Sequence, residues 1–436
     1  MSRSKFLSPF QKFVKIEGFS GILLLITTII ALVWANSPLA DSYRAIWEYK
    51  VGVTTTDFEL YKPLILWVND GLMAIFFFLI GLEIKREFYI GELNSLKKLA
   101  FPLFGALGGL TVPVILFLVL NVDPETYNGW GIPMATDIAF SLAVLNVLGR
   151  RVPLSLKIFL TAFAIVDDIG AVGAIAIFYS GDINLAYVGM AVILLGALYL
   201  LTSRGYYSKY LIIFGGIIIW FLFLKSGIHP TVAGILLAFS VPVRQKVDTI
   251  KFIDILSDIT TRIQHATVLN KPILSIEQIG HIDDLENWIN KYQSPLQRSE
   301  HRLHDWVAYF IIPVFALANA GVELRGDLEW DTLLISNIAV CLVLGKSVGI
   351  SFFVLMAKKM RLIKIPDDIT NQHIVGVSFL AGIGFTMAIF ISNLAFAGQP
   401  AYIDSAKIGI LIGSFISAII GYIILRRSAS STNVDI

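Results

Sequence analysis

Four ionisable residues lie inside long apolar runs of the sequence: Asp137 in GIPMATDIAF, adjacent Asp167 and Asp168 in TAFAIVDDIGAV, and Lys346 in LVLGKSVGI. An ionisable group in a lipid-embedded helix costs at least ~2.5–3.5 kcal/mol, so it requires a partner or a function. Two adjacent carboxylates repel one another where water is scarce, and helix packing does not require both. Asp167 and Asp168 therefore predict a site that binds protons or a small cation. For Asp137 or Lys346 alone, a buried ion pair that only fixes helix packing remains an equal alternative.

Helix-breaking residues interrupt two of these apolar runs. Glycines and a proline at 129–133 precede Thr136 and Asp137, and the segment 382–384 reads Gly-Ile-Gly. An interrupted helix frees backbone carbonyls that can coordinate a cation, and Thr136 adds a hydroxyl. The half-helix ends carry partial charges, which Asp137 and Lys346 could neutralise. Two interrupted spans, one in each half of a chain, are typical of transporters with inverted repeats and a site at mid-membrane.

The composition places these residues in an integral membrane protein. Of the 436 residues 56% are hydrophobic and 15% are charged, whereas a soluble protein of this size has about a quarter of its residues charged. The net charge of +2 provides no basic surface for nucleic acid, and disordered and fibrous classes are excluded as well. The single cysteine, Cys341, cannot form an intramolecular disulfide, and no Cys/His spacing indicates a structural metal.

We predict an all-α, polytopic membrane protein with about twelve transmembrane helices, because about twenty apolar residues cross a bilayer as a helix. An even number places both termini on one side, which the Lys/Arg-rich loops identify as cytoplasmic. Residues 1–427 would form one membrane transporter domain, with a cytoplasmic insertion at 245–294 and a cytoplasmic tail at 428–436. The predicted spans are 17–38, 63–84, 99–120, 128–148, 153–179, 185–202, 208–224, 227–243, 304–322, 332–356, 373–397 and 404–425.

Two segments are predicted to lie outside the bilayer. Residues 43–62 mix aromatic and β-branched residues around a glycine and predict an extracellular hairpin. In the insertion, isoleucines and a leucine recur at helical spacing after Ser275, which forms a capping box with Gln278. We expect an amphipathic helix there that lies on the protein or membrane surface, in preference to a separate activity.

The sequence closely resembles the NhaA-type sodium/proton antiporters along almost every predicted span. Residues 245–293 and the tail after Arg427 lie outside the resemblance. The matching stretches are VNDGLMAIFFFLIGLEIKRE, PMATDIAFSLAVLNVLGRRVPLSLKIFLTAFAIVDDIGA, GIHPTVAGILLAF, EHRLHDWVAYFIIPVFALANAG, LVLGKSVGIS and AGIGFTMAIFIS.

The resemblance implies a fold with inverted repeats and two broken, crossing helices. It implies an ion and proton site at Asp167 and Asp168, which would bind Na⁺, with Thr136, Asp137 and Lys346 beside them. It also implies a cytoplasmic funnel where pH is sensed, lined by Glu83, Arg86, Glu87, Glu300, His301 and His304. The family commonly has a lysine where this chain has Gln297, which affects the expected pH threshold.

The resemblance further implies a pH-regulated, electrogenic antiporter in the bacterial inner membrane that expels Na⁺, and Li⁺, in exchange for external H⁺. Such a protein is not an enzyme and requires no cofactor. An exposed strand edge pairs readily with another copy, so we expect a homodimer through the 43–62 hairpin.

Two other functions are compatible with intramembrane aspartates. A sodium-coupled solute symporter would require a second polar cavity, and the spans have no surplus of polar residues to line one. An intramembrane aspartyl protease would require a Gly-x-Gly-Asp motif, which precedes none of Asp137, Asp167 and Asp168.

Overall fold

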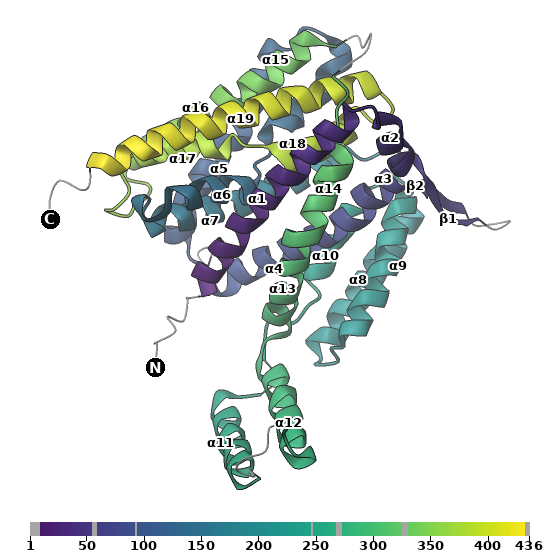
Figure 1. Ribbon diagram of the computed structural model, residues 1–436, viewed down its shortest axis with the longest axis vertical. Helices are drawn as coiled ribbons and strands as arrows, with labels where there is room; N and C mark the ends of the chain where they lie inside the picture. Colours follow the sequence, from purple (N-terminus) through teal and green to yellow (C-terminus); the bar gives the residue numbers. More distant parts are fainter. Residues whose placement is uncertain are drawn as a thin grey trace.

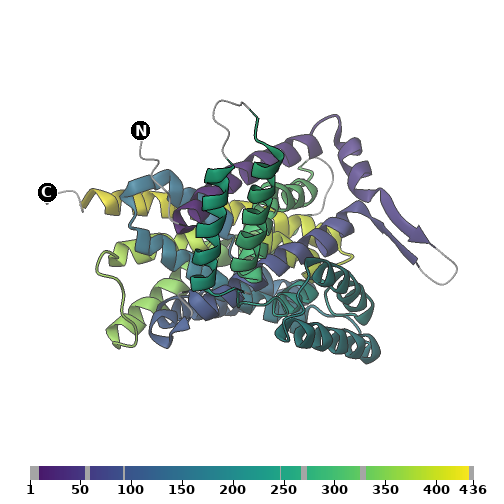
Figure 2. The ribbon, with the colours of Figure 1, turned by 90° about the horizontal axis from the view of Figure 1, so that it is seen from below.

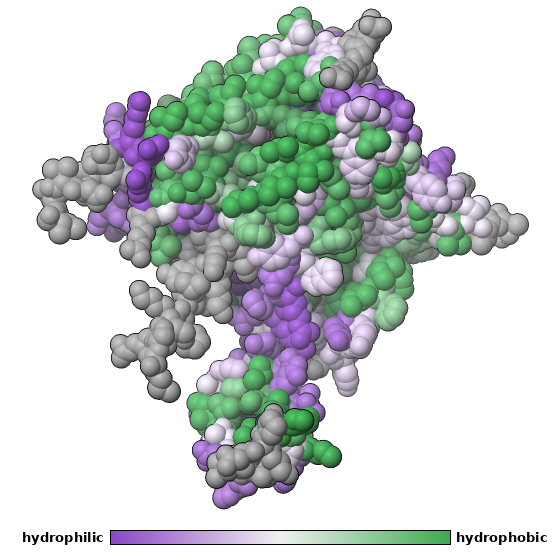
Figure 3. Space-filling view, in the orientation of Figure 1, coloured by the Kyte–Doolittle hydropathy of each residue, from purple (hydrophilic) through white to green (hydrophobic). Residues whose placement is uncertain are grey.

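The computed structural model describes residues 9–54, 59–91, 94–245, 247–266, 273–324 and 330–431. The tip of the predicted hairpin (55–58) and the end of the predicted tail (432–436) lie outside the described residues. The chain is a helical bundle with one two-stranded sheet at its edge (Figure 1). Apolar side chains cover much of the bundle surface, as expected of a protein surrounded by lipid (Figure 3).

The helices and strands follow one another along the chain with few long connections. In the first half they are α1 Pro9–Ala35, α2 Ala40–Glu48, β1 Lys50–Thr54, β2 Glu59–Pro63, α3 Leu64–Leu66, η1 Trp67–Leu72, α4 Met73–Ile90, α5 Leu96–Leu120, η3 Pro124–Met134, α6 Ile138–Leu148, η4 Gly149–Arg151, α7 Leu154–Phe178, α8 Leu185–Ser203 and α9 Lys209–Ser226. In the second half they are α10 Thr231–Ala238, α11 Thr249–His265, α12 Ile276–Tyr292, α13 Pro295–Trp306, η5 Val307–Ile311, α14 Ile312–Asn319, α15 Thr332–Val340, η6 Cys341–Gly345, α16 Lys346–Lys359, α17 Asn371–Ala381, α18 Phe385–Ala395 and α19 Pro400–Ser431. The segments η1, η5 and η6 are π-helical turns within longer helices.

Among the described residues, eight helices are long and apolar enough to cross a membrane, or ten if each of two bent helix pairs counts as one span. Two of the predicted spans do not meet this criterion. The span 227–243 contains α10, which has only eight residues, and 304–322 is formed by the end of α13 with η5 and α14. The last helix also runs to Ser431, so the first residues of the predicted tail are helical.

Two groups of three spans lie together on one side of the bundle, at the upper left of Figure 1, and run in opposite directions. The first is α5, the bent pair η3/α6 and α7; the second is α15–α16, the bent pair α17/α18 and α19. The bends are 45° in η3/α6 and 43° in α17/α18. The first group starts at the end of the bundle where α1 begins and α19 ends, which we call the termini end. The second starts at the opposite end, beside the strands, which we call the hairpin end (Figure 1). This arrangement confirms the predicted inverted repeats.

The predicted hairpin is present but shorter than 43–62. Strands β1 and β2 pair antiparallel from Lys50↔Pro63 to Thr54↔Glu59 and project from the bundle (Figures 1 and 2). Residues 43–48 instead belong to α2, because Tyr43 and Trp47 lie one helical turn apart and are both buried. The Tyr43 hydroxyl donates a hydrogen bond to the carbonyl of Leu317, which holds α2 against the bundle.

The insertion forms a pair of helices, α11 and α12, that projects from the termini end (Figures 1 and 2). The predicted capping box of Ser275 and Gln278 starts α12. Helix α12 packs against α11, where Phe252 and Tyr292 stack at 4.1 Å, and does not lie flat on the protein. The two ends of the insertion meet, because the Leu296 amide donates to the Pro242 carbonyl at 3.1 Å.

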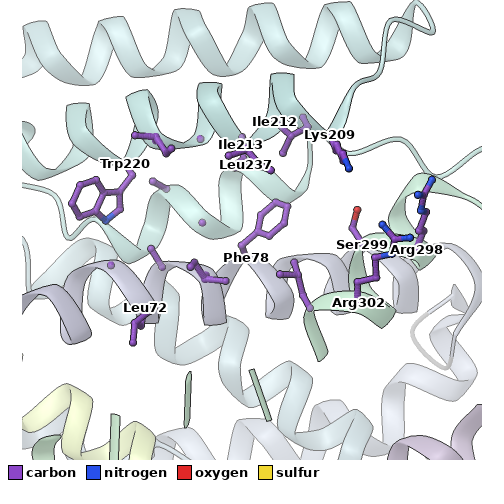
Figure 4. Close-up of a pocket in the computed structure, with 18 of the residues that line it drawn as sticks. Leu72, Phe78, Lys209, Ile212, Ile213, Trp220, Leu237, Arg298, Ser299 and Arg302 are labelled. Atoms are coloured by element: carbon purple, nitrogen blue, oxygen red, sulfur yellow. The ribbon is translucent and has the colours of Figure 1, made fainter. Parts of the chain in front are cut away.

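A groove of about 1310 Å³ runs along α4, α9, α10 and α13 (Figure 4). Apolar side chains form most of its wall, with Trp67 and Trp220 stacked near the hairpin end. Its lining includes the basic residues Lys209, Lys291, Arg298 and Arg302, and Lys209, Arg298 and Arg302 lie at its other end (Figure 4). A groove of this composition faces lipid or another protein surface rather than a polar solute.

The two repeats approach most closely where glycines oppose each other on α5 and α16. A Cβ placed on Gly349 would lie 2.2 Å from the carbonyl oxygen of Gly108, and the reverse is equally close. We expect Gly349→Ala to lower the melting temperature in detergent by several degrees, because backbone must move to admit the methyl group, at about 1–3 kcal/mol. Gly196→Ala on α8 is the control, since nothing lies within 4 Å of its Cβ position. Equal melting temperatures for the two variants would contradict this packing.

Candidate ion-binding site

The two broken spans cross at their breaks and are joined there by hydrogen bonds. Residues 135–137 separate η3 from α6, and residues 382–384 separate α17 from α18. The Asp137 amide donates to the Ile383 carbonyl at 2.7 Å, and the Thr136 hydroxyl donates to the Ala381 carbonyl at 3.0 Å. Backbone carbonyls that lose their helical partners at the second break thus accept hydrogen bonds from residues at the first break.

The Asp137 carboxylate lies at the amino-terminal ends of two half-helices, α6 and α18. It is the N-cap of α6, and its Oδ1 accepts from the Phe140 amide at 3.0 Å. Its Oδ2 accepts from the amide of Thr386, at the start of α18, at 3.1 Å and from the Thr386 hydroxyl at 2.6 Å. Helix amino termini carry partial positive charge, so one buried carboxylate compensates two of them. Asp137 therefore lies where the sequence analysis expects it, next to half-helix ends whose partial charge it can neutralise.

Lys346 joins the second repeat to the first. It begins α16 directly after the π-helical turn η6, and its side chain is fully buried. Its Nζ donates to Asp167 Oδ2 at 2.8 Å and also to the Thr136 hydroxyl. The predicted partners Thr136, Asp167 and Lys346 therefore meet in one place, although they come from three different spans.

Asp168 lies beside this ion pair without a protein partner of its own. Its side chain is 3% exposed, and no hydrogen bond or ion pair engages it within the part of the chain that the structure describes. The second oxygen of Asp167, Oδ1, is also buried and accepts no hydrogen bond from these residues. Carboxylate oxygens are the ligands that small hard cations prefer. Asp168 and Asp167 Oδ1 can therefore accept a cation or a proton.

A second ionisable cluster lies toward the termini end, between α4 and α13. Arg86 contacts Glu300, and its Nη2 donates to Glu87 at 2.7 Å. Glu83 lies 3.8 Å from His304 Nδ1, and Glu83, Glu300 and His304 are all buried. Helix α4 in turn packs against α7, which carries Asp168. Five of the six predicted funnel residues are thus brought together.

Within this cluster Glu300 titrates near neutral pH. It lies on α13, before the apolar stretch that starts at 304. Burial raises the pKa of Glu300 to about 7, although Arg86 acts to lower it, and Glu83 raises it further. The sixth predicted residue, His301, is exposed, and no contact with the other five places it in the cluster. Gln297, where the family commonly has a lysine, is also exposed.

Several polar residues at these sites were not predicted. Thr386 follows a glycine break, which is the signal that could have identified it. Lys85 is buried and donates to the carbonyls of Phe239 and Val241 after α10, at 2.7 and 2.6 Å. Its neighbours in sequence are charged, so it resembles an ordinary basic residue at a membrane boundary. His229, which the sequence analysis did not single out, lies 3.7 Å from Asp70 and contacts Thr231.

The chain matches known antiporters over nearly its whole length. A family model described as Na⁺/H⁺ antiporter 1 matches residues 11–425. The Na⁺/H⁺ antiporter NhaA of Oleidesulfovibrio alaskensis is 45% identical over 428 residues, which cover 97% of this chain and 94% of that protein. The NhaA of Bacteroides thetaiotaomicron is 41% identical over 435 residues, with 96% of this chain and 97% of that protein covered. The chain belongs to the Na⁺/H⁺ antiporter 1 family.

Proposed function

We propose that this chain exchanges Na⁺, and Li⁺, for H⁺ across the inner membrane of a bacterium, and that Asp168 and Asp167 bind both ions in turn. The observation that supports this most directly is the buried Asp168 carboxylate, which has no described protein partner and lies next to the Lys346–Asp167 ion pair. Family membership favours the same activity over a symporter or a protease.

When the charges at the site are counted, one negative charge has no positive partner, and a single cation could neutralise it. Two half-helix ends, each equivalent to about +0.5 charge, offset Asp137. Lys346 offsets Asp167. The charge of Asp168 remains, and either Na⁺ or H⁺ can neutralise it. Because the two ions compete for the same oxygens, each orientation of the carrier is loaded with one or the other, and this competition couples the two fluxes.

Exchange would be electrogenic if two protons leave the site for each Na⁺ that enters. Asp168 supplies one proton. The Lys346 ammonium supplies the second when Na⁺ takes its place beside Asp167, so the Na⁺-loaded site carries one negative charge more than the proton-loaded site. One net charge then crosses the membrane in each cycle, and the membrane potential drives Na⁺ extrusion.

The distribution of basic residues supports an orientation with both termini in the cytoplasm. Lys97 and Lys98 near the start of α5, Arg151 in η4 and Lys358 and Lys359 at the end of α16 all lie at the termini end. Lysine and arginine are enriched in cytoplasmic loops. The hairpin end is then extracellular, and the Glu83–Glu300 cluster lies on the cytoplasmic side of the ion site.

We further propose that this cytoplasmic cluster senses pH. Above pH 7 Glu300 is ionised and pairs with Arg86, whereas below it the carboxyl is protonated, since its pKa is about 7. His304 Nδ1 lies 3.8 Å from Glu83, and His304 also acts to lower the pKa of Glu300. Protonation changes in the cytoplasmic cluster can regulate transport at Asp168 only if they favour one conformation of the carrier over another. Helix α4, which carries Glu83 and Arg86, packs against α7, which carries Asp168, and so connects the cluster to the ion site.

Asp168→Asn should abolish exchange, because the amide preserves the volume but neither titrates nor provides an anionic ligand. The measurement is Na⁺-induced proton release from everted vesicles, with Asp254→Asn on exposed α11 as the control. Near-normal exchange by Asp168→Asn would overturn the assignment of the ion site.

Lys346→Ala should lower the melting temperature in detergent more than Asp168→Asn does. Removing one partner of a buried ion pair leaves Asp167 uncompensated and typically costs about 3–5 kcal/mol. Lys359→Ala, at an exposed position, is the control. A melting temperature of Lys346→Ala equal to that of the control would exclude the balancing role of the lysine.

The pH-sensing proposal predicts shifts of the same sign at saturating Na⁺. Glu300→Gln resembles the protonated carboxyl, so the activity midpoint should move to higher pH. His304 lowers the pKa of Glu300, so His304→Ala should keep that carboxyl protonated to higher pH and move the midpoint in the same direction. Each shift should be about half a pH unit, the effect of a modest ion pair. His301→Ala is the exposed control. Unmoved midpoints in all three variants would mean that competition at Asp168 alone sets the pH dependence.

We also propose a homodimer in which hairpins β1–β2 pair. Support comes from the exposed strand β1 and from the apolar groove beneath the hairpin, which includes Trp47, Leu64 and Trp67. A second copy of the chain placed beside the hairpin would cover both the exposed edge of β1 and the apolar groove.

Replacing residues 50–63 with a short glycine-serine linker should give monomers that still exchange Na⁺ for H⁺. Size-exclusion chromatography with light scattering measures the mass, and the vesicle assay measures exchange. The matched control removes the other projecting element, residues 248–292, and should remain dimeric. Dimers that persist without the hairpin would place the interface elsewhere.

A further inference from the structure

Three asparagines meet between the ion site and the hairpin end, two of them buried (Asn69 and Asn319) and one half-buried (Asn393). They are Asn69 in η1, Asn319 at the end of α14 and Asn393 in α18. Asn69 and Asn319 exchange two hydrogen bonds, at 3.2 and 2.8 Å. Asn393 donates to Asn319 Oδ1 at 2.8 Å, and Asn319 also donates to the Phe315 carbonyl. Asn319 therefore uses all of its hydrogen-bonding capacity.

Only Asn393 lies on an element that carries the ion site. One face of α18 bears Thr386, Phe390 and Asn393, which are spaced by four and three residues. Thr386 binds Asp137 at the helix break, so α18 is attached to the site at one end and to Asn319 near the other. Asn69 and Asn319 lie on η1 and α14, which pack against each other. The Asn393–Asn319 contact thus joins the broken span to a separate pair of helices.

Phe390 occupies the space between these two attachments. Its ring lies 5.6 Å from Phe77, 6.3 Å from Phe315 and 5.3 Å from His229, and it is fully buried. Along α18, Phe390 and then Asn393 follow the helix break at Thr386 in the direction of the hairpin end. Phe390 in the aromatic layer and Asn393 in the amide layer both belong to α18, so movement of α18 would separate both from the neighbouring helices.

We propose that the Asn393–Asn319 hydrogen bond is a latch that holds the extracellular side of the antiporter closed, and that it must open for Na⁺ to leave and H⁺ to enter there. The inference rests on the proposed exchange activity and orientation. A neutral amide pair suits this task, because it contributes only about 0.5–1.5 kcal/mol and does not depend on pH. The latch can therefore open in every cycle, while the charged groups remain available for ions and pH sensing.

Asn393→Ala removes the latch without leaving its partner unsatisfied, since Asn319 Oδ1 still accepts from Asn69. The equilibrium should shift toward the outward-open form by about two- to tenfold, the effect of one neutral hydrogen bond. A control of the same chemistry is Asn337→Ala. That buried amide donates to the Phe117 carbonyl and accepts from the Cys341 thiol, away from α18.

A cysteine in place of Ile389 reports the shift in a Cys341→Ala background, in which no buried donor is left facing Asn337. Ile389 is 1% exposed and lies one turn nearer the ion site than Asn393. In right-side-out vesicles, a membrane-impermeant maleimide should label this cysteine about two- to tenfold faster when Asn393→Ala is added. Unchanged labelling, or equal acceleration by Asn337→Ala, would overturn the latch.

A second measurement requires no reporter. In proteoliposomes, the KM for Na⁺ added at the extracellular face should fall by the same factor in Asn393→Ala, because a larger fraction of carriers is open to that side. An unchanged external KM would also overturn the proposal. Labelling does not depend on transport, so failure of the exchange activity and failure of the latch give different results.

Discussion

Charge neutrality in a low-dielectric interior is the constraint on which this structure depends. Breaking two helices inside a membrane exposes four helix ends, and the fold tolerates them because compensating groups meet them. Asp137 accepts hydrogen bonds from two amino-terminal ends, and Lys346 lies beside the site with Asp167. Asp168 is the one carboxylate left over. In the proposed function, a cation binds here because the fold leaves the Asp168 carboxylate without a compensating charge.

The two inverted repeats make this charge balance possible because each contributes charged or polar groups that the other does not have. The first repeat provides all three aspartates, and the second provides the lysine and Thr386. Opposed Gly108 and Gly349 allow α5 and α16 to approach closely, one helical turn from Lys346. Close backbone packing therefore places the lysine within reach of Asp167, although 179 residues separate them in the chain.

The ion site was the part of the molecule most open to prediction. Asp137, Asp167, Asp168 and Lys346 are conspicuous because charge is rare in apolar runs, and glycines mark both breaks. Features set by tertiary contacts were not predictable in the same way. Residues 43–48 form a helix because two aromatic side chains bury against the bundle, and α12 packs on α11 instead of lying flat. His301 is exposed because of the way α13 is rotated about its own axis against the bundle, and the spacing of residues in the sequence does not determine that rotation.

The insertion has a structural property that is useful beyond the transport cycle. Its two ends are held together by the hydrogen bond between Leu296 and Pro242, so the core of the bundle is nearly indifferent to what the intervening chain contains. Different lengths at this position could arise in evolution at little energetic cost. For the same reason, the paired helices α11 and α12 offer a site outside the bundle at which to fuse a soluble domain. Such a fusion would give a small membrane protein the mass and the recognisable outline that particle alignment in electron cryomicroscopy requires.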